Sequence, residues 1–375
     1  MRYLPLIAIL GCLIAATAHS QLGPRAEIEG GTIVGIESSG IYSFRGIPYA
    51  TPPVGNLRWA PPQPAKAWST PMDCTSFAPI APQPPYPEDS LYARAPRPQS
   101  EDCLYLNVWT ETMDSDAKRP VMFWIHGGGF TRGTGATDAY DGSALARKGV
   151  VVVTINYRLG VLGFMAHPEL TAESEHKASG NYAIMDMVAA LEWVRDNIET
   201  FGGDPGNVTI FGESAGSAAV SALIGTPLAK GLFHRGIGQS GAALGPMPQL
   251  QETTDSNPSA ESLGEVFQKS VGAESLAAMR SMSVDDLMTV ANQRSAPNFR
   301  INVDGYVFPT SVMDAYRNGT HNDVPVMVGF NQDEMTAFIP EAMIPKTMEA
   351  FETAAKQSYG DDWPALQKLY PVFEQ

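Results

Sequence analysis

Short apolar runs separated by polar segments mark the middle of the chain. Residues 121–125 and 150–155 are rich in β-branched and aromatic residues. Runs of this length and composition suit strands buried on both faces, as in a parallel sheet. Residues 207–211 are again strand-like, and residues 324–330 predict a later buried strand. In that last run Pro325 stands near the start, where a missing backbone donor matters least.

Apolar positions at helical spacing lie between these runs. Five apolar residues within positions 181–200 recur every three or four places, which predicts a helix with one core face. They are Ile184, Val188, Leu191, Val194 and Ile198. Two glycines and a proline within residues 202–205 end this helix. Small residues at 215–222 predict another helix, and the more polar stretch 249–296 predicts helices joined by loops. Strand and helix therefore alternate as in a parallel α/β fold.

Prolines are concentrated before the predicted sheet. Fourteen of the 30 prolines fall between Pro48 and Pro98. Since proline fixes φ and lacks a backbone donor, this segment cannot form a long helix or a central strand. We expect an extended segment that wraps the core and is held by aromatic anchors such as Trp59 and Trp68.

Composition and charge narrow the class of protein. Hydrophobic residues make up 44% of the 375 positions, as in ordinary globular proteins. The formal net charge of −15 repels phosphate backbones, so a nucleic-acid-binding role is not expected. One stretch, at the N-terminus, approaches the hydrophobicity of a membrane span, which excludes a polytopic membrane protein.

The N-terminus has the layout of an export signal. A basic start is followed by an apolar run over residues 4–16 and by the small-x-small pattern of Ala16 and Ala18. The run is short for a stable anchor, so we expect residues 1–18 to be a signal peptide, cleaved after Ala18. The mature protein would then be secreted or periplasmic. Lipidation at Cys12 is the alternative, because residues 9–12 loosely resemble a lipoprotein cleavage box.

Two cysteines, Cys74 and Cys103, remain after such a cleavage. An even pair in an oxidising compartment predicts one disulfide, which would stabilise the fold by about 3–4 kcal/mol on the chain-entropy model. Two buried free thiols are the alternative. Neither cysteine has a histidine at a ligand spacing, so no metal site and no cofactor are expected.

Two glycine-rich motifs carry the candidate chemistry. Gly212-Glu213-Ser214-Ala215-Gly216 follows a predicted strand and opens a predicted helix, the context of a nucleophile elbow. The glycines allow a sharp turn, and the helix N-terminus favours developing negative charge at the serine.

The second motif, residues 126–130 (HGGGF), follows the strand that ends at Ile125. Its glycines let backbone N–H groups approach a tetrahedral oxyanion closely. No Lys-Ser/Thr follows, so a Walker motif fails, and the glycine spacing does not fit a dinucleotide fingerprint. The two motifs together favour an acyl-transfer site over two unrelated tight turns.

Further motifs resemble the type-B carboxylesterase/lipase family, which includes the cholinesterases. They are residues 44–50 (FRGIPYA), 52–55 (PPVG), 57–59 (LRW), 100–107 (SEDCLYLN), 156–160 (NYRLG) and 201–205 (FGGDP). The resemblance runs from about residue 28 to 340 in the right order. It implies an α/β-hydrolase fold for residues 19–375, a mostly parallel sheet flanked by helices. It also implies that Ser214 is the nucleophile, that Gly128, Gly129 and Ala215 supply the oxyanion N–H groups, and that Cys74 pairs with Cys103.

The resemblance also implies a catalytic acid but leaves the base unassigned. Residues 329–334 (GFNQDE) fit the family's pattern around its acid, which identifies Glu334. The order serine, acid, histidine requires a histidine after Glu334, and residues 335–375 contain none. We therefore interpret the sequence as a hydrolase truncated at its C-terminus, with its base and last strands missing. The alternative is a catalytically inactive binding or scaffold protein with an esterase-like fold.

The absence of a tryptophan between the two cysteines bears on the class of ester substrate. The choline-handling branch holds a quaternary ammonium on a tryptophan between the two cysteines, and residues 75–102 contain no tryptophan. A small-molecule carboxylic ester is the expected substrate, rather than a choline ester.

We expect the reading frame to continue beyond codon 375 and to encode a Gly-x-x-His segment with further α/β elements. Sequencing the coding DNA past this codon checks the expectation. A stop codon directly after Gln375 would contradict it.

Overall fold

The computed structural model describes residues 23–85, 97–255, 257–334, 339 and 343–369. The signal peptide predicted at 1–18, with Cys12, lies outside the described residues. The chain divides into two compact units, one ending at Val328 and one running from Gly329 to Gln375, and each is described by itself. No helix in the described part is long and apolar enough to cross a membrane.

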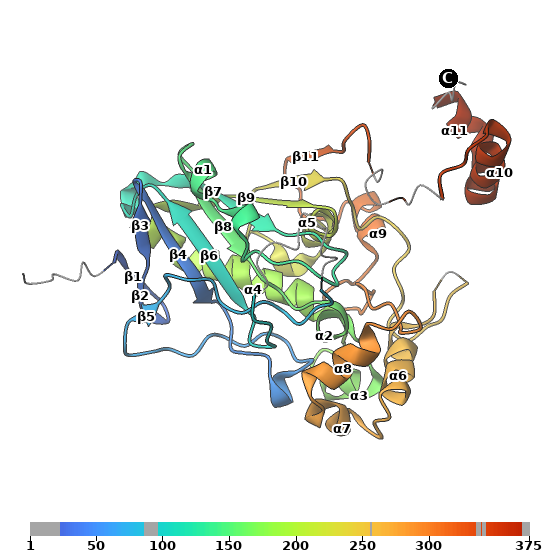
Figure 1. The fold of residues 1–375 in the computed structure, drawn as a ribbon, viewed down its shortest axis with the longest axis horizontal. Helices are drawn as coiled ribbons and strands as arrows, with labels where there is room; N and C mark the ends of the chain where they lie inside the picture. The colour runs from blue at the N-terminus through green and yellow to red at the C-terminus, as the bar shows by residue number, and fades with distance from the viewer. Residues whose placement is uncertain (1–22, 86–96, 256, 335–338, 340–342, 370–375) are drawn as a thin grey trace, which may run out of the picture. The chain divides into compact units, whose positions relative to one another are not determined.

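A large sheet in the first unit carries the fold (Figure 1). Its strand order is β11-β10-β9-β7-β8-β6-β4-β3. The four strands from β8 to β10 run parallel, whereas β3, β4 and β6 form an antiparallel edge. The sheet strands are β3 (Ile36–Ser38), β4 (Ile41–Pro48), β6 (Tyr105–Thr110), β7 (Arg119–Ile125), β8 (Val151–Ile155), β9 (Gly203–Glu213), β10 (Arg235–Gln239) and β11 (Val326–Gly329). This is the mostly parallel sheet that the sequence predicts.

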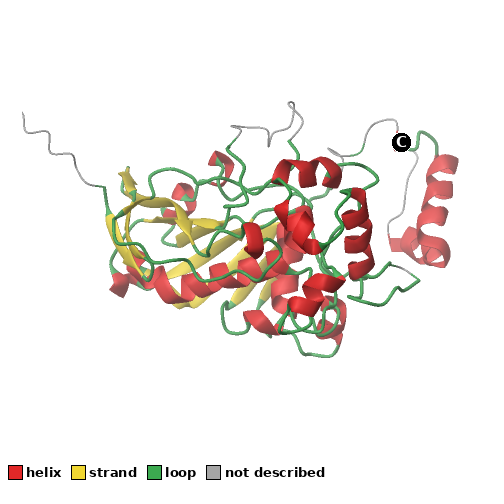
Figure 2. Cartoon of the chain, turned by 90° about the horizontal axis from the view of Figure 1, so that it is seen from below, coloured by secondary structure: helices red, strands yellow, loops and turns green. Residues whose placement is uncertain are grey.

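Helices cover both faces of this sheet (Figure 2). Successive side chains of a strand point to opposite faces, so a continuously apolar strand is buried only when both faces are covered. On one face, Val151 and Val153 of β8 join the main core, which includes α4 (Tyr182–Asn197) and α5 (Ala215–Gly225). On the other face, Val152 packs with Trp109 of β6 and Ala146 of α1 (Ser143–Ala146).

The remaining helices surround this core or belong to the second unit. In the first unit they are α2 (Gly160–Phe164), α3 (Pro168–Glu173), α6 (Ala260–Ser270), α7 (Leu276–Ser281), α8 (Val284–Ala291) and α9 (Val312–Arg317). The second unit contains α10 (Met348–Tyr359) and α11 (Trp363–Leu369), where the Phe351 ring packs edge-on against the buried Trp363. The helices predicted within 249–296 are confirmed as α6, α7 and α8.

The long predicted helix is confirmed as α4, but its burial is wider than expected. The five predicted core residues are all buried, as are Asp186, Ala190 and Trp193 on the remaining surface. The helix therefore buries most of its circumference rather than one face. A 3-10 turn over Ile198–Phe201 follows, and Gly202, with φ 73°, reverses the chain into β9.

The strand predicted at 324–330 is present, but the prediction that it is buried is wrong. The segment does form a strand, β11, but Val326, Met327 and Val328 are 47%, 67% and 77% exposed. The reason is its position at the end of the strand order, with β10 on one side. An apolar run predicts a strand, whereas burial depends on whether other elements cover it.

The proline-rich segment wraps the core as predicted. Between β4 and β6 the described residues hold a 3-10 turn, Gly55–Leu57, and the two-residue strand β5 (Met72–Asp73), which joins β1 (Arg25–Ile28) and β2 (Gly31–Val34) in a small sheet. Trp59 is buried and its indole N–H donates to the Val161 carbonyl at 3.0 Å. The Trp68 indole donates to the Thr32 carbonyl at 2.8 Å.

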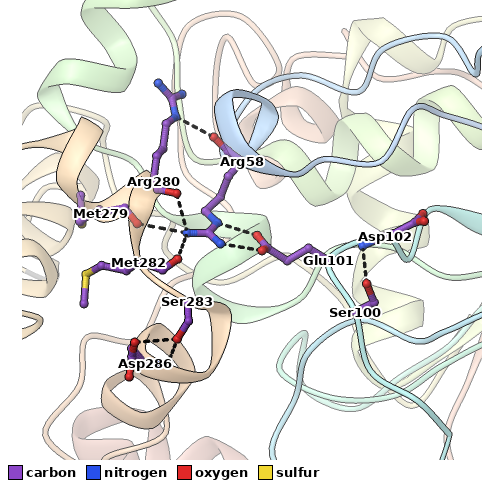
Figure 3. Close-up of polar contacts among 9 residues, drawn as sticks. All are labelled: Arg58, Ser100, Glu101, Asp102, Met279, Arg280, Met282, Ser283 and Asp286. Atoms are coloured by element: carbon purple, nitrogen blue, oxygen red, sulfur yellow. Dashed lines mark hydrogen bonds and ion pairs between the residues drawn. The ribbon is translucent and has the colours of Figure 1, made fainter.

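Arg58 ties this wrapping segment to α7 (Figure 3). Its guanidinium donates two hydrogen bonds of 2.6 Å to the Glu101 carboxylate. On its other side it donates to the carbonyls of Met279, Arg280 and Met282, at 3.1, 3.2 and 2.9 Å. A fixed positive charge at the C-terminal end of a helix satisfies carbonyls that lack intrahelical partners.

The predicted Cys74–Cys103 disulfide is not formed in this structure, which instead shows the alternative of two buried free thiols. Burial raises the pKa of the Cys74 thiol to about 12 and raises that of Cys103 well above its ordinary value. Since the thiolate is the reactive form, burial of this kind opposes oxidation.

Arg58→Met should destabilise the protein by about 3–5 kcal/mol, because it leaves the Glu101 carboxylate, which is only 11% exposed, without its partner. Urea denaturation measures the difference. Arg317→Met is the matched control, since Arg317 pairs with Asp314 at the surface and its loss should cost at most about 1 kcal/mol. Equal effects of the two substitutions would contradict this role for Arg58.

Candidate active site

Ser214 lies at a sharp turn between β9 and α5. Its backbone adopts φ 56° and ψ −120°, a conformation that residues with a side chain rarely occupy. The Ser214 N–H donates to the Gln239 carbonyl of β10 at 2.8 Å, which helps to hold the turn. This strained strand–turn–helix geometry is the one the elbow motif predicts, and it places Ser214 at the N-terminal end of α5.

The glycines that flank Ser214 are required by close backbone contacts. A Cβ atom at Gly212 would lie 2.5 Å from the Gly216 carbonyl carbon, and one at Gly216 would lie 2.1 Å from the Ile125 carbonyl oxygen. Both distances are far shorter than a van der Waals contact. The turn therefore packs directly against the end of β7, with no room for side chains.

The glycine turn after β7 reaches the same place. Strands β7 and β9 are parallel neighbours with Ile125 opposite Gly212, so the two turns leave the sheet at the same edge. A Cβ atom at Gly127 would lie 3.1 Å from Ser214 Cβ. Gly128 and Gly129 have φ angles of 107° and 64°, which favour glycine.

The structure thus brings the Ser214 turn and the 127–129 turn together. The first N–H groups of a helix have no intrahelical acceptor, and Ala215 is the first residue of α5. The assignment of the Ala215, Gly128 and Gly129 N–H groups as donors to an oxyanion stays a prediction, but the contact of the two turns is consistent with it. This arrangement can stabilise negative charge that develops on a carbonyl oxygen under attack.

His126 opens the glycine turn but is unsuited to be a base. Its ring is buried, stacks on Tyr157 with centroids 4.3 Å apart, and has Nδ1 2.8 Å from the Gly127 carbonyl oxygen. Burial lowers the pKa of His126 to about 4, so the ring is neutral at physiological pH. We infer that it supports the turn by packing and by this hydrogen bond.

The other described histidines have structural contacts elsewhere. His167 accepts from the Glu169 N–H at the start of α3, and His234 accepts from the Val208 N–H beside β9. His176 stacks on the ring of Tyr306, and His321 stacks on that of Tyr316. Each of these four side chains thus has a structural contact.

Glu334 belongs to the second unit, where it follows β11 in a turn. Its Oε1 accepts a hydrogen bond of 2.8 Å from the Asn331 N–H. The structure describes this turn by itself, so the assignment of Glu334 as catalytic acid stays a prediction.

Sequence reasoning missed the polar residues that support the glycine turn. Asn156 Oδ1 accepts from the Thr134 hydroxyl and from the Gly135 N–H, at 2.8 and 2.9 Å. The Thr154 hydroxyl donates to the Gly135 carbonyl at 2.8 Å. Thr154 was visible as a polar position inside the apolar run 150–155. Its partner could not be identified without the fold.

Comparison with known proteins gives the same family as the motifs. The model of the carboxylesterase family matches residues 23–370. The chain is 40% identical to the fumonisin B1 esterase of Sphingopyxis macrogoltabida over 352 residues, covering 92% of this chain and 62% of that protein. It is 38% identical to the para-nitrobenzyl esterase of Bacillus subtilis, covering 91% of this chain and 69% of that protein.

Solved structures agree with this comparison. A para-nitrobenzyl esterase structure superposes with a TM-score of 0.76 at 35% identity and covers 93% of this chain and 72% of its own. A carboxylesterase of Geobacillus stearothermophilus gives 0.77 at 35% identity, covering 90% and 69%. The chain thus has the α/β-hydrolase fold of these esterases, and it spans less than two thirds of the length of the fumonisin B1 esterase.

Replacing Ser214 by glycine or alanine should reveal the backbone strain at this position. Ser214→Gly should be about 1 kcal/mol more stable than Ser214→Ala, because glycine adopts a positive φ without strain. Urea denaturation of both variants measures the difference. Ser221, inside α5, provides the control, since glycine there should be less stable than alanine by about 1 kcal/mol. The same sign at both positions would contradict strain at Ser214.

Proposed function

This chain belongs to the carboxylesterase family, and on that premise we propose that it is a serine carboxylic-ester hydrolase with Ser214 as its nucleophile. The observation that carries the proposal is the contact of two backbone turns, one carrying the strained Ser214 and the other the glycines 127–129. Such a pair of turns suits acyl transfer, which needs a nucleophile and a preformed oxyanion hole.

The proposed reaction has two steps. Ser214 Oγ attacks the ester carbonyl carbon while Gly128, Gly129 and Ala215 N–H groups bind the oxyanion. The Ser214 proton passes to the imidazole of a histidine base, which residues 335–375 do not contain. The carbon–oxygen bond to the alcohol then breaks, and the base returns the proton to that alcohol. Water repeats the sequence on the acyl-enzyme, releasing the acid and restoring Ser214.

Glu334 is proposed as the acid that orients the imidazole. Its place after β11 and its Gly-x-Asn-x-Asp-Glu context support this role. No histidine follows Glu334 in the sequence, and the described histidines have the structural contacts given above. Loss of one triad member typically leaves about 10³–10⁴-fold catalysis over water, so we expect slow turnover from these 375 residues alone.

A small-molecule carboxylic ester is the proposed substrate. The absence of tryptophan from residues 75–102 argues against a site for a quaternary ammonium group. The relatives named as a fumonisin B1 esterase and a para-nitrobenzyl esterase support ester hydrolysis, without fixing the acyl or alcohol group. The N-terminal sequence supports export, so we place the reaction in the periplasm or outside the cell.

A binding or scaffold protein with an inactive esterase fold is the second candidate. The described histidines have structural contacts of their own, which favours it. Against it, the serine, the flanking glycines and the strained backbone at Ser214 are all present, and a binding surface needs none of that strain.

A fluorophosphonate should form a stoichiometric adduct on Ser214 of the native protein encoded by the complete reading frame, and Ser214→Ala should abolish it. Intact-mass measurement followed by peptide mapping checks this without requiring rapid turnover. Denatured protein is the control for non-specific labelling. An absent adduct on the folded protein would overturn the esterase proposal and support the scaffold.

A further inference from the structure

The glycine turn has a return limb, residues 132–135, that packs backbone against backbone on the first limb. A Cβ atom at Gly133 would lie 2.4 Å from the Gly127 carbonyl oxygen, and one at Gly128 would lie 2.2 Å from the Arg132 carbonyl oxygen. The Arg132 N–H also donates to the Gly128 carbonyl at 3.1 Å. Any shift of the return limb therefore moves the limb that carries the proposed oxyanion donors.

One buried side chain holds both backbone groups of Gly133. Gln83 Oε1 accepts from the Gly133 N–H at 2.7 Å, and Gln83 Nε2 donates to the Gly133 carbonyl at 2.9 Å. The residue is 7% exposed. A primary amide supplies one acceptor and two donors in a plane, which matches the N–H and carbonyl of a single residue.

Gln83 is itself fixed in place. Its Nε2 also donates to the Ala81 carbonyl at 3.0 Å, and its backbone N–H donates to the Gln99 side chain at 2.8 Å. These contacts lie within the segment between Cys74 and Cys103, and Gln83 itself is 50 residues before Gly133. The return limb is thus held from one side by this segment and from the other by Thr154 and Asn156.

We infer that Gln83 is a positioning residue for the oxyanion hole, acting through Gly133 on the donors at Gly128 and Gly129. This inference deepens the proposed function and rests on it. Gln83 need not touch the substrate. Its effect should appear where negative charge develops on the carbonyl or phosphoryl oxygen, since a displacement of about 1 Å can cost about 100-fold in rate.

Gln83→Met keeps the length of the side chain and removes both hydrogen bonds to Gly133. We expect the maximal rate of Ser214 modification by the fluorophosphonate to fall about 10- to 100-fold, with the half-saturating probe concentration changed less than threefold. Gln63→Met is the matched control, because Gln63 is exposed and its Nε2 donates to the nearby Pro61 carbonyl. It should react like the unmodified protein.

Gln83→Glu adds a second test, in which a purely structural role of Gln83 predicts no change of the rate ratio with pH. A protonated glutamic acid can accept from the Gly133 N–H and donate to its carbonyl, as the amide does, whereas the carboxylate repels that carbonyl. Burial raises a carboxyl pKa. The rate of Gln83→Glu relative to unmodified protein should therefore rise as the pH falls from 8 to 5. The ratio cancels pH effects common to both proteins, including titration of His126.

The outcomes separate the two proposals. If the protein with its native sequence does not react with the fluorophosphonate, both the proposed function and this inference are overturned. Reactive unmodified protein with equally reactive Gln83→Met overturns the inference alone. If Gln83→Met fails to fold, as judged by its thermal melting, Gln83→Glu decides, and a flat rate ratio between pH 8 and pH 5 overturns the inference.

Discussion

Backbone packed directly on backbone at the carboxyl ends of β7 and β9 is the constraint on which the candidate site depends. Gly216 lies against the last carbonyl of β7, and Gly127 lies against the Ser214 turn. A methyl group at either glycine would force the strands apart or move the serine. The parallel pairing of β7 and β9 makes the contact possible, because it directs both turns to one edge of the sheet.

Turns that approach this closely cannot be solvated on their inner side, so their polar groups need partners from the protein. Buried amides and hydroxyls provide them. Asn156 and Thr154 come from β8 and its end, whereas Gln83 comes from the wrapping segment. The proline-rich segment is thus more than a cover, since it contributes hydrogen bonds to the turn that carries the proposed donors. Arg58 ties the same segment to α7.

Much of the fold was predictable because its signals are local. The apolar runs at 121–125 and 150–155, the helical spacing within 181–200 and the glycines at 202–203 each reflect physics within a few residues. The turns at Ser214 and at residues 127–129 were predictable for the same reason, as short motifs require glycine at fixed positions. Burial was less predictable: the run at 324–330 is as apolar as the others, but β11 lies at the end of the strand order and is exposed.

The sequence by itself determined the α/β class, the elbow at Ser214 and the glycine turn beside it, because each is encoded by neighbours along the chain. The tertiary structure decided which groups meet across long separations. It placed the Gln83 amide on Gly133, 50 residues away, and buried most of the surface of α4. It also kept Cys74 and Cys103 as separate buried thiols. Such pairings depend on the packing of the whole sheet, and no local pattern of residues specifies them.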